Sequence, residues 1–255
     1  MSKQLSQSQA MRYNRQIMLA GFDLERQEML LNAKVLQIGV GGLGCASAQY
    51  LVAAGIGQLT LVDDDQVELT NLQRQILHNE ADIGISKVQS AVDSLNQLNS
   101  DCQLIAIAQR LADPQLTELI CQHDLVLDCS DNLATRNQLN RLCVTNKIPL
   151  VCGAAIRMEG QITSIIPGGD NPCYQCLSQF FAEQQLSCVE AGVMAPLVGI
   201  IGAMQALEAI KIITAYGQNL AGKLMLLDGK THQWQSFNLV KDPHCKLCGH
   251  SPNEN

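Results

Sequence analysis

The sequence predicts an α/β fold: a doubly wound, mostly parallel Rossmann-like sheet, extended by a mixed C-terminal half that carries a structural zinc site. Three observations support this fold class. Strand and helix patterns alternate between residues 34 and 152, and the glycine-rich segment Gly39–Gly44 joins the first strand to the first helix. The chain of 255 residues is 47% hydrophobic and 16% charged, so it can bury a substantial core.

The N-terminal elements follow from the hydrophobic pattern. Residues 11–31 are expected to form a helix, because charged residues lie between apolar ones, and Lys34–Ile38 a buried strand. After the glycine turn we expect a helix to Ala54, a strand over Leu59–Val62 and an amphipathic helix over Lys87–Leu98. The alternation continues with the following elements: a strand over Leu104–Ala108, a helix from Asp113, a strand over Leu125–Asp128, a helix over Leu133–Thr145 and a short strand over Leu150–Cys152.

The pattern changes after Gly153. Strands are expected over Gln161–Ile166, Leu224–Asp228 and Gln235–Val240, with a long helix over Ala195–Ala215 between the first two. These elements are expected to continue the same sheet. The prediction is a single domain over residues 1–255, with a nucleotide-binding part at about 11–152 and a carrier-binding and zinc part at about 153–250.

The net charge and the N-terminal segment argue against some classes of partner and location. The formal net charge is −7 and the sequence pI about 5.2, which argues against nucleic acid or an anionic membrane as the main partner. The polar segment Met1–Gln9 has no apolar secretory core, so a cytoplasmic location is expected. In that compartment the eleven cysteines are expected to be metal ligands or buried thiols instead of disulfides.

One uncharged run, Ala191–Leu207, needs a separate interpretation. It is shorter than the roughly 20 apolar residues that a membrane span requires, and it contains Pro196 and Gln205. A buried helix is therefore favoured. The run also contains small residues that would let another helix approach closely, and a subunit interface there stays open: Gly199, Gly202, Ala203 and Ala206.

The glycine turn predicts a nucleotide site. Gly39 permits a tight turn, Gly41 lets a phosphate approach the backbone, and Gly44 lets the helix pack on the strand. The free N–H groups at the start of the helix favour an anion. Asp63 ends the second strand about 20 residues beyond the last glycine, where a carboxylate binds ribose hydroxyls.

Cationic residues distinguish between nucleotides. A helix N-terminus can bind the two phosphates of NAD almost unaided, whereas an adenylation reaction must also stabilise a leaving pyrophosphate. Arg74 and Lys87 can supply that stabilisation, which favours ATP. Asp131 follows the strand Leu125–Asp128 at the same edge of the sheet, where it can hold Mg²⁺.

Several motifs together resemble one family. They are Arg12–Ile17, Gly39–Gly44, Asn71–Gln75, Asp128–Asn132 and Cys188–Gly192. These segments are similar to the ubiquitin-activating-like adenylyltransferases of the HesA/MoeB/ThiF family, and the likeness runs from about residue 11 to 250. Within the family, residues 153–161 most resemble the MoeB type, the molybdopterin-synthase adenylyltransferases.

The resemblance implies a reaction and its partners. A small ubiquitin-like sulfur carrier ending in Gly-Gly is adenylated at its C-terminal carboxylate by Mg-ATP, and a sulfur donor protein then acts on the adenylate. Arg15 matches an arginine that reaches the ATP site of the other subunit, which implies a homodimer. The implied catalytic residues are Arg15, Arg74, Lys87 and Asp131. The implied nucleotide-binding residues are Gly39, Gly41, Gly42, Gly44, Asp63, Thr70, Asn71, Leu72, Gln73, Arg74, Lys87, Asp131 and Asn132.

Two Cys-x-x-Cys pairs predict a structural metal site. Cys173 and Cys176 form the first pair, and Cys245 and Cys248 the second. Four thiolates suit tetrahedral Zn²⁺ with no open position. Cys188 is unpaired; in some relatives the cysteine here accepts the activated carrier covalently, but no nearby base that would activate the thiol can be identified from the sequence.

The sequence leaves three alternative functions open. A ThiF-type enzyme, which acts on the carrier of the thiamine pathway, shares every nucleotide motif. An NAD-dependent oxidoreductase is less favoured, because no acid/base pair for hydride transfer is evident. A non-catalytic scaffold that binds the carrier is disfavoured by the intact set of Asp63, Arg74, Lys87 and Asp131.

Overall fold

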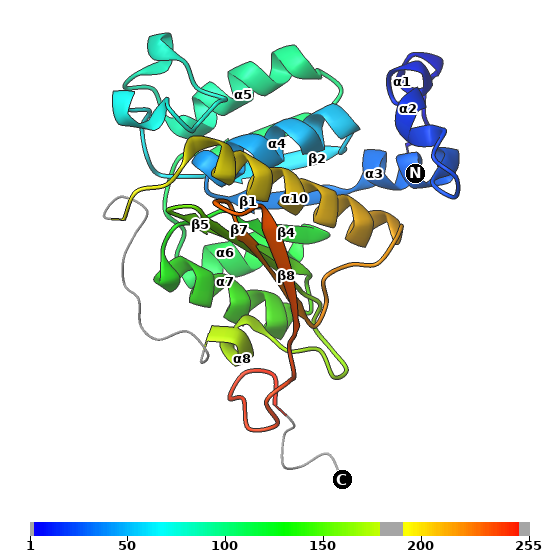
Figure 1. Cartoon of the computed structure of the whole chain (residues 1–255). Helices are drawn as coiled ribbons and strands as arrows, with labels where there is room; N and C mark the ends of the chain where they lie inside the picture. Colours follow the sequence, from blue (N-terminus) through cyan, green and yellow to red (C-terminus); the bar gives the residue numbers. More distant parts are fainter. Residues whose placement is uncertain (1–2, 179–190, 250–255) are drawn as a thin grey trace.

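An eight-stranded mixed sheet runs through the computed structural model, which describes residues 3–178 and 191–249 (Figure 1). The strand order is β3-β2-β1-β4-β5-β6-β7-β8. Five strands are parallel: β1 (Lys34–Ile38), β2 (Gln58–Val62), β3 (Gln103–Ile107), β4 (Leu125–Asp128) and β5 (Leu150–Ile156). The other three continue the sheet in antiparallel fashion: β6 (Glu159–Ile165), β7 (Lys223–Asp228) and β8 (Gln233–Asn238). The expected parallel core with a mixed C-terminal extension is confirmed.

Helices cover both faces of the sheet, and two hydrophobic cores result. In Figure 1 the upper face carries α4 (Gly42–Ala54), α5 (Lys87–Leu98) and α10 (Ala195–Thr214). The lower face carries α6 (Asp113–Cys121), α7 (Leu133–Asn146) and α8 (Tyr174–Ser178). Two 3₁₀ turns, Leu69–Asn71 and Glu80–Asp82, lie between β2 and α5.

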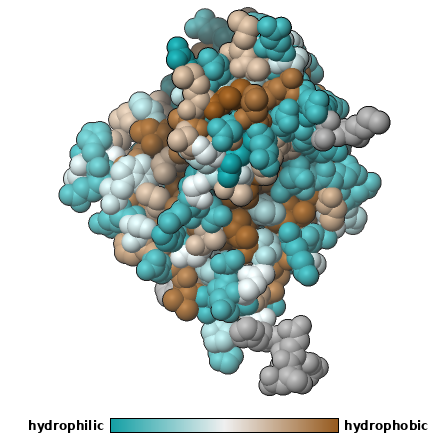
Figure 2. All heavy atoms as spheres, turned by 90° about the vertical axis from the view of Figure 1, so that its right-hand side faces the viewer, coloured by the Kyte–Doolittle hydropathy of each residue, from teal (hydrophilic) through white to brown (hydrophobic). Residues whose placement is uncertain are grey.

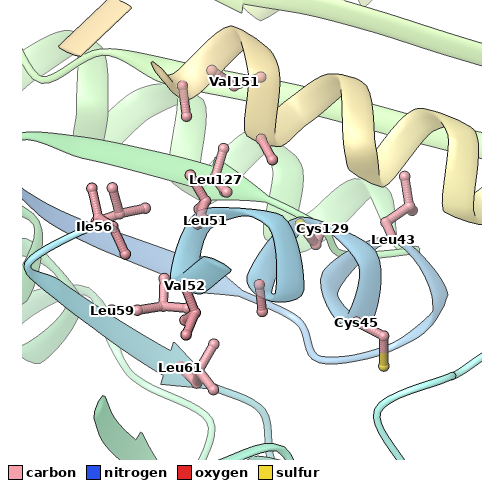
Figure 3. Packing of buried hydrophobic residues seen from close by; sticks show 14 of the residues in the cluster. Leu43, Cys45, Leu51, Val52, Ile56, Leu59, Leu61, Leu127, Cys129 and Val151 are labelled. Atoms are coloured by element: carbon pink, nitrogen blue, oxygen red, sulfur yellow. The ribbon is translucent and has the colours of Figure 1, made fainter. Parts of the chain in front are cut away.

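The upper core is built on α4, which lies between the sheet and its helical neighbours. Figure 3 shows Leu51 and Val52 of this helix against Leu59 and Leu61 of β2. Nine of the thirteen residues of α4 are buried, so its sequence has no continuous polar stripe. By contrast α5 is amphipathic, as the sequence predicts, and only one of its faces is buried.

One predicted element is wrong in detail. Residues 11–31 do not form a single helix: the chain forms α1 (Gln7–Arg12), α2 (Asn14–Ile17) and α3 (Asp23–Asn32). The chain turns at Gly21, with φ of 78°, and at Asp23, with φ of 54°, and neither angle is compatible with a continuous right-handed helix.

Within the described residues, α10 is the one helix long and apolar enough to cross a membrane by length and composition. Half of its apolar window is buried inside the protein, and core helices pass the same test. A Cβ on Gly202 would lie 2.2 Å from the backbone oxygen of Leu43, so α10 crosses α4 at backbone contact. The close approach expected from the small residues at this point is therefore made within the chain.

A buried histidine ties β2 to the end of α6. The His123 side chain is 4% exposed, its Nδ1 lies 2.7 Å from the Leu119 carbonyl oxygen, and its Nε2 lies 2.8 Å from Thr60 Oγ1. A carbonyl oxygen can only accept, so Nδ1 carries the hydrogen and Nε2 accepts from the threonine hydroxyl. Burial holds the pKa of His123 below its ordinary value of 6.5.

This neutral histidine predicts a loss of stability at acid pH. The unfolded chain takes up a proton near pH 6.5, whereas folded His123 stays neutral to lower pH. The free energy of unfolding therefore falls as the pH decreases through 6.5, until the pH reaches the folded-state pKa. Urea unfolding of the wild type and His123→Gln between about pH 7.5 and 5.5 measures this, and the variant should show the shallower decline. Parallel pH profiles would contradict the assignment.

Candidate nucleotide-binding site

The turn between β1 and α4 requires glycine at two positions, Gly39 and Gly44. Gly39 has φ of 96°, in the left-handed region that disfavours side chains. A Cβ on Gly44 would lie 2.1 Å from the Gly39 carbonyl oxygen, which is impossible without moving backbone. The first turn of α4 is thereby packed directly onto the end of β1.

A buried glutamine holds this turn from beneath. Gln37 lies on β1 and is fully buried; its Nε2 donates to the carbonyl oxygens of Gly39 and Gly44, both at 3.0 Å. Its Oε1 accepts from Ser47 Oγ on α4 at 2.9 Å. No role was predicted for Gln37, although a lone amide inside an apolar strand is a signal of a buried hydrogen-bonding role.

A cavity of about 730 Å³ opens beside the turn, at the carboxyl ends of the parallel strands. Most of the predicted nucleotide residues line it: Gly39, Gly41, Gly42, Asp63, Thr70, Asn71, Gln73, Arg74, Lys87, Asp131 and Asn132. Three predicted residues do not: Gly44 is buried beneath the turn, Leu72 lies outside the cavity wall, and Arg15 lies elsewhere.

Asp63 is held at the cavity by backbone donors. Its Oδ2 accepts from the Val40 amide at 2.7 Å, and its Oδ1 from the Asp65 amide at 2.9 Å. Burial raises the pKa of Asp63 above its ordinary value, although these two amides oppose the shift. A half-buried carboxylate beside the glycine turn can accept hydrogen bonds from ligand hydroxyls.

Two predicted cations line the cavity from different segments, together with Arg110, for which no role was predicted. Lys87, at the start of α5, is 6% exposed, and its ammonium donates to Asp65 Oδ2 at 2.6 Å. Arg74 Nη1 donates to the Thr70 carbonyl oxygen at 3.0 Å. No carboxylate in the described part of the chain pairs with Arg74, so its charge is available to an anionic ligand.

Asn71 contributes chiefly to the loop that carries Arg74. Its Oδ1 accepts from the Glu68 amide at 3.1 Å, and its own amide donates to the Glu68 backbone carbonyl oxygen at 2.9 Å. Asn71 is 8% exposed while Thr70 beside it is exposed. This reciprocal cap fixes the short 3₁₀ turn, so the arginine leaves it in a defined direction.

Asp131 and Asn132 lie on the loop between β4 and α7. The Asn132 side chain accepts from the Thr135 amide at 2.9 Å and so caps the helix. Asp131 is exposed at the cavity, with its carboxylate available to a ligand.

A buried ion pair shapes this loop from behind. Arg136 Nε donates to Asp128 Oδ2 at 3.1 Å, and neither side chain is more than 9% exposed. The other carboxylate oxygen accepts from the Ser130 amide at 3.0 Å and from its hydroxyl at 2.6 Å. Arg136 Nη2 also reaches the carbonyl oxygens of Ser130 and Gly153. Sequence reasoning gave Arg136 no role, because a polar residue in a helix normally faces solvent.

Arg15 lies at the opposite edge of the sheet. Two nearby residues in the sequence show this position. Arg12 Nη1 donates to the Leu98 carbonyl oxygen at the end of α5, and Gln16 Nε2 donates to the Ala54 carbonyl oxygen at the end of α4. Both helices begin at the cavity and run away from it. Arg15 therefore does not join the cavity of its own chain, and its predicted role stays a prediction.

The four cysteines of the two Cys-x-x-Cys pairs lie close together, at the end of the molecule that carries α8 (Figure 1). One sulfur from each of Cys173, Cys176, Cys245 and Cys248 lies within 4.8 Å of all the others. The separation is 3.7 Å between Cys173 and Cys245, and 3.4 Å between Cys176 and Cys248. The cluster could hold a metal ion. Cys188 lies outside the described residues.

Comparison with known proteins identifies relatives over nearly the whole chain. The ThiF family matches residues 13–248. The molybdopterin-synthase adenylyltransferase of Salmonella typhimurium is 53% identical over 246 residues, covering 96% of this chain and 99% of that protein. The sulfur carrier protein ThiS adenylyltransferase of Escherichia coli is 45% identical, covering 94% and 96%. The crystal structure of E. coli MccB with ATP has a TM-score of 0.83 at 27% identity, covering 93% of this chain and 74% of that one.

The buried pair of Asp128 and Arg136 predicts a large stability effect. Arg136→Met keeps most of the side-chain volume but leaves a carboxylate buried without its cation, which costs about 3–5 kcal/mol. Urea unfolding measures the loss. Arg141→Met is the matched control, because its ion pair with Asp113 is about half exposed, and it should cost under about 1 kcal/mol. Equal effects of the two substitutions would contradict the interpretation.

Proposed function

The chain belongs to the ThiF family, and from this premise we propose that it is an adenylyltransferase acting in molybdenum cofactor biosynthesis. It transfers AMP from ATP to the C-terminal glycine carboxylate of a ubiquitin-like sulfur carrier, the small subunit of molybdopterin synthase, and releases pyrophosphate. The observation that carries the proposal is the cavity itself, where a glycine turn, Asp63, Arg74 and Lys87 meet. The names of the most similar relatives support the substrate.

The residues of the cavity suit this reaction. The carrier carboxylate attacks the α-phosphorus, a new oxygen–phosphorus bond forms, and the bond to the β-phosphate oxygen breaks. Asp63 accepts hydrogen bonds from the ribose, and the free amides at the start of α4 bind phosphate. Arg74 and Lys87 neutralise the departing pyrophosphate. The reaction needs no protein nucleophile, because positioning and charge neutralisation supply the catalysis.

Asp131 is the residue that would hold Mg²⁺. Its exposed carboxylate lines the cavity, and such oxygens together with phosphate oxygens are the ligands that Mg²⁺ prefers. When bound, the ion supplies further neutralisation of phosphate charge. Asn132 beside it fixes the loop by capping α7, so the carboxylate is presented from a rigid helix start.

A second copy of the chain completes the proposed site. Helix α2, which carries Arg15, lies on the right in Figure 1, and Figure 2 shows this side of the molecule, where apolar patches lie among polar ones. Several exposed apolar side chains of the N-terminal segment are candidates for a subunit interface: Met11, Met18, Leu19, Leu24 and Met29. Their burial against a partner would favour the homodimer through which Arg15 reaches the other cavity.

We propose that the cysteine cluster holds a structural Zn²⁺. In a tetrahedral site with zinc–sulfur bonds of about 2.3 Å, neighbouring sulfurs lie about 3.8 Å apart. The observed separations of 3.4 and 3.7 Å agree with that arrangement. Four thiolates leave no open position for chemistry. The metal would join the segment after β6 to the C-terminal segment, both remote from the cavity.

A second candidate is the ThiF-type reaction on the carrier of the thiamine pathway. It is supported by the 45% identity to the E. coli ThiS adenylyltransferase. The 53% identity to a molybdopterin-synthase adenylyltransferase favours the first candidate. The two reactions share the nucleotide chemistry and differ in the protein that presents the carboxylate. In either case a separate sulfur donor must act on the adenylate.

The carrier assignment predicts selective ATP–pyrophosphate exchange. The wild type should exchange pyrophosphate in the presence of the molybdopterin synthase small subunit, and much more slowly with the thiamine-pathway carrier. Removal of the final Gly-Gly from the carrier should abolish exchange, because no carboxylate then reaches the α-phosphate. Faster exchange with the thiamine-pathway carrier would favour the second candidate.

The assigned charges predict the effect of two substitutions on the same assay. Arg74→Ala and Asp131→Asn should each lower exchange by about 10²-fold or more, because each removes charge stabilisation from the departing phosphate. Urea unfolding should be nearly unchanged, since neither side chain pairs with a buried charge. Arg141→Ala, on an exposed helix surface, is the matched control. Near-normal exchange in either variant would remove that residue from the mechanism.

The cysteine cluster predicts one zinc ion per chain and a stability effect of its loss. Metal analysis of freshly purified protein should find zinc, and removal by a chelator should lower the thermal midpoint. Cys248→Ser should reproduce the loss, whereas Cys121→Ser, at an exposed free cysteine, should not. A zinc content well below one per chain would contradict the proposal.

A further inference from the structure

A buried line of hydrogen bonds connects the surface to the glycine turn. Ser90 Oγ lies 2.9 Å from Asp82 Oδ2 and 2.8 Å from His78 Nδ1. At the other end of the ring, His78 Nε2 lies 3.2 Å from the carbonyl oxygen of Val40. His78 is 6% exposed and Ser90 2%, so water does not compete for these bonds.

The hydrogen on one ring nitrogen of His78 is fixed by this geometry. A carbonyl oxygen can only accept, so Nε2 must donate to Val40. If the Ser90 hydroxyl points at Asp82, then Nδ1 donates to it and the ring is charged; if the hydroxyl points at Nδ1, the ring is neutral. Nε2 keeps its hydrogen in both arrangements. Cys45 Sγ lies 3.4 Å from the Val40 oxygen and 3.7 Å from His78 Nε2, but a thiol is a weak donor and a weak acceptor, so the carbonyl oxygen is the stronger partner of Nε2.

Both polar groups of the Val40 backbone are consequently hydrogen-bonded. Its amide donates to Asp63 Oδ2 at 2.7 Å, and its carbonyl oxygen accepts from His78. In a trans peptide the carbonyl group and the following N–H point in opposite directions, and the described chain contains no cis peptide. A Val40 carbonyl directed at His78 therefore directs the Gly41 N–H the other way.

The Gly41 amide is free for a ligand. Gly41 lines the cavity, and within residues 3–178 and 191–249 no hydrogen bond uses its N–H. The same histidine is also tied to the segment that carries Arg74, because its own amide donates to the Gln75 carbonyl oxygen at 3.1 Å. His78 thus connects the two segments that would hold the phosphates.

We propose that His78 is a positioning residue, which aims the Gly41 N–H at a nucleotide phosphate by holding the Val40 carbonyl. The inference rests on the proposed function only in placing ATP at this turn. It assigns His78 no contact with the substrate. Its effect should appear in the binding of phosphate groups and not in the binding of the nucleoside.

Calorimetric binding of ATP and of adenosine separates these two contributions. In His78→Phe the ring shape is kept and the donor is lost, so ATP should bind about tenfold more weakly while adenosine binds as to the wild type. His78→Gln places an amide donor near the position of Nε2 and should recover most of the ATP affinity. His123→Gln, at an equally buried histidine remote from the cavity, is the matched control and should change neither affinity.

The outcomes are distinguishable. Unchanged ATP affinity in His78→Phe, an equal loss for ATP and adenosine, or no recovery in folded His78→Gln would each overturn the proposal. If His78→Phe does not fold, Ser90→Ala tests the same line, because a ring released at Nδ1 should also weaken ATP binding and spare adenosine. Failure of the wild type to bind ATP would overturn the proposed function itself.

Discussion

Backbone atoms of neighbouring elements pack directly against the first turn of α4, and the rest of the structure depends on this close packing. Gly44 touches the carbonyl of Gly39, so the helix begins in direct backbone contact with β1. From the other side α10 meets Leu43 at Gly202, again without an intervening side chain. Because backbones are in van der Waals contact on both sides, helix α4 has little freedom to tilt. The amides at the start of α4 are therefore oriented before any ligand arrives, which is the condition for effective electrostatic stabilisation.

Buried polar side chains maintain the shape that this constraint creates. Gln37 supports the turn from β1, and Gln205 on α10 donates to the Asp128 carbonyl oxygen at 2.7 Å. Arg136 performs the same task on the neighbouring loop with a full charge. Each of these groups would destabilise the core if it were unpaired, so each fixes the backbone atoms that satisfy it. The backbone around the cavity is therefore held by hydrogen bonds from buried polar side chains.

The sequence predicts the parts of the site that follow from local chemistry. The Gly39–Gly44 turn, Asp63 and the order of elements through β5 need only hydrophobic periodicity and the demands of a tight turn. Arg136, Gln37 and His78 could not be found in this way, because their partners come from other elements and only the folded chain brings them together. The wrong prediction over residues 11–31 is different, because the break is local: Gly21 interrupts the helical spacing and has a positive φ.

The cysteine cluster has a consequence for how the chain is connected. Cys173 and Cys245 are 72 residues apart in sequence, and α10, β7 and β8 all lie between them. The proposed Zn²⁺, bound by all four sulfurs, would close this stretch into a ring. A peptide bond cut anywhere inside the ring would leave both fragments attached, and α10 could not diffuse away from the turn it supports.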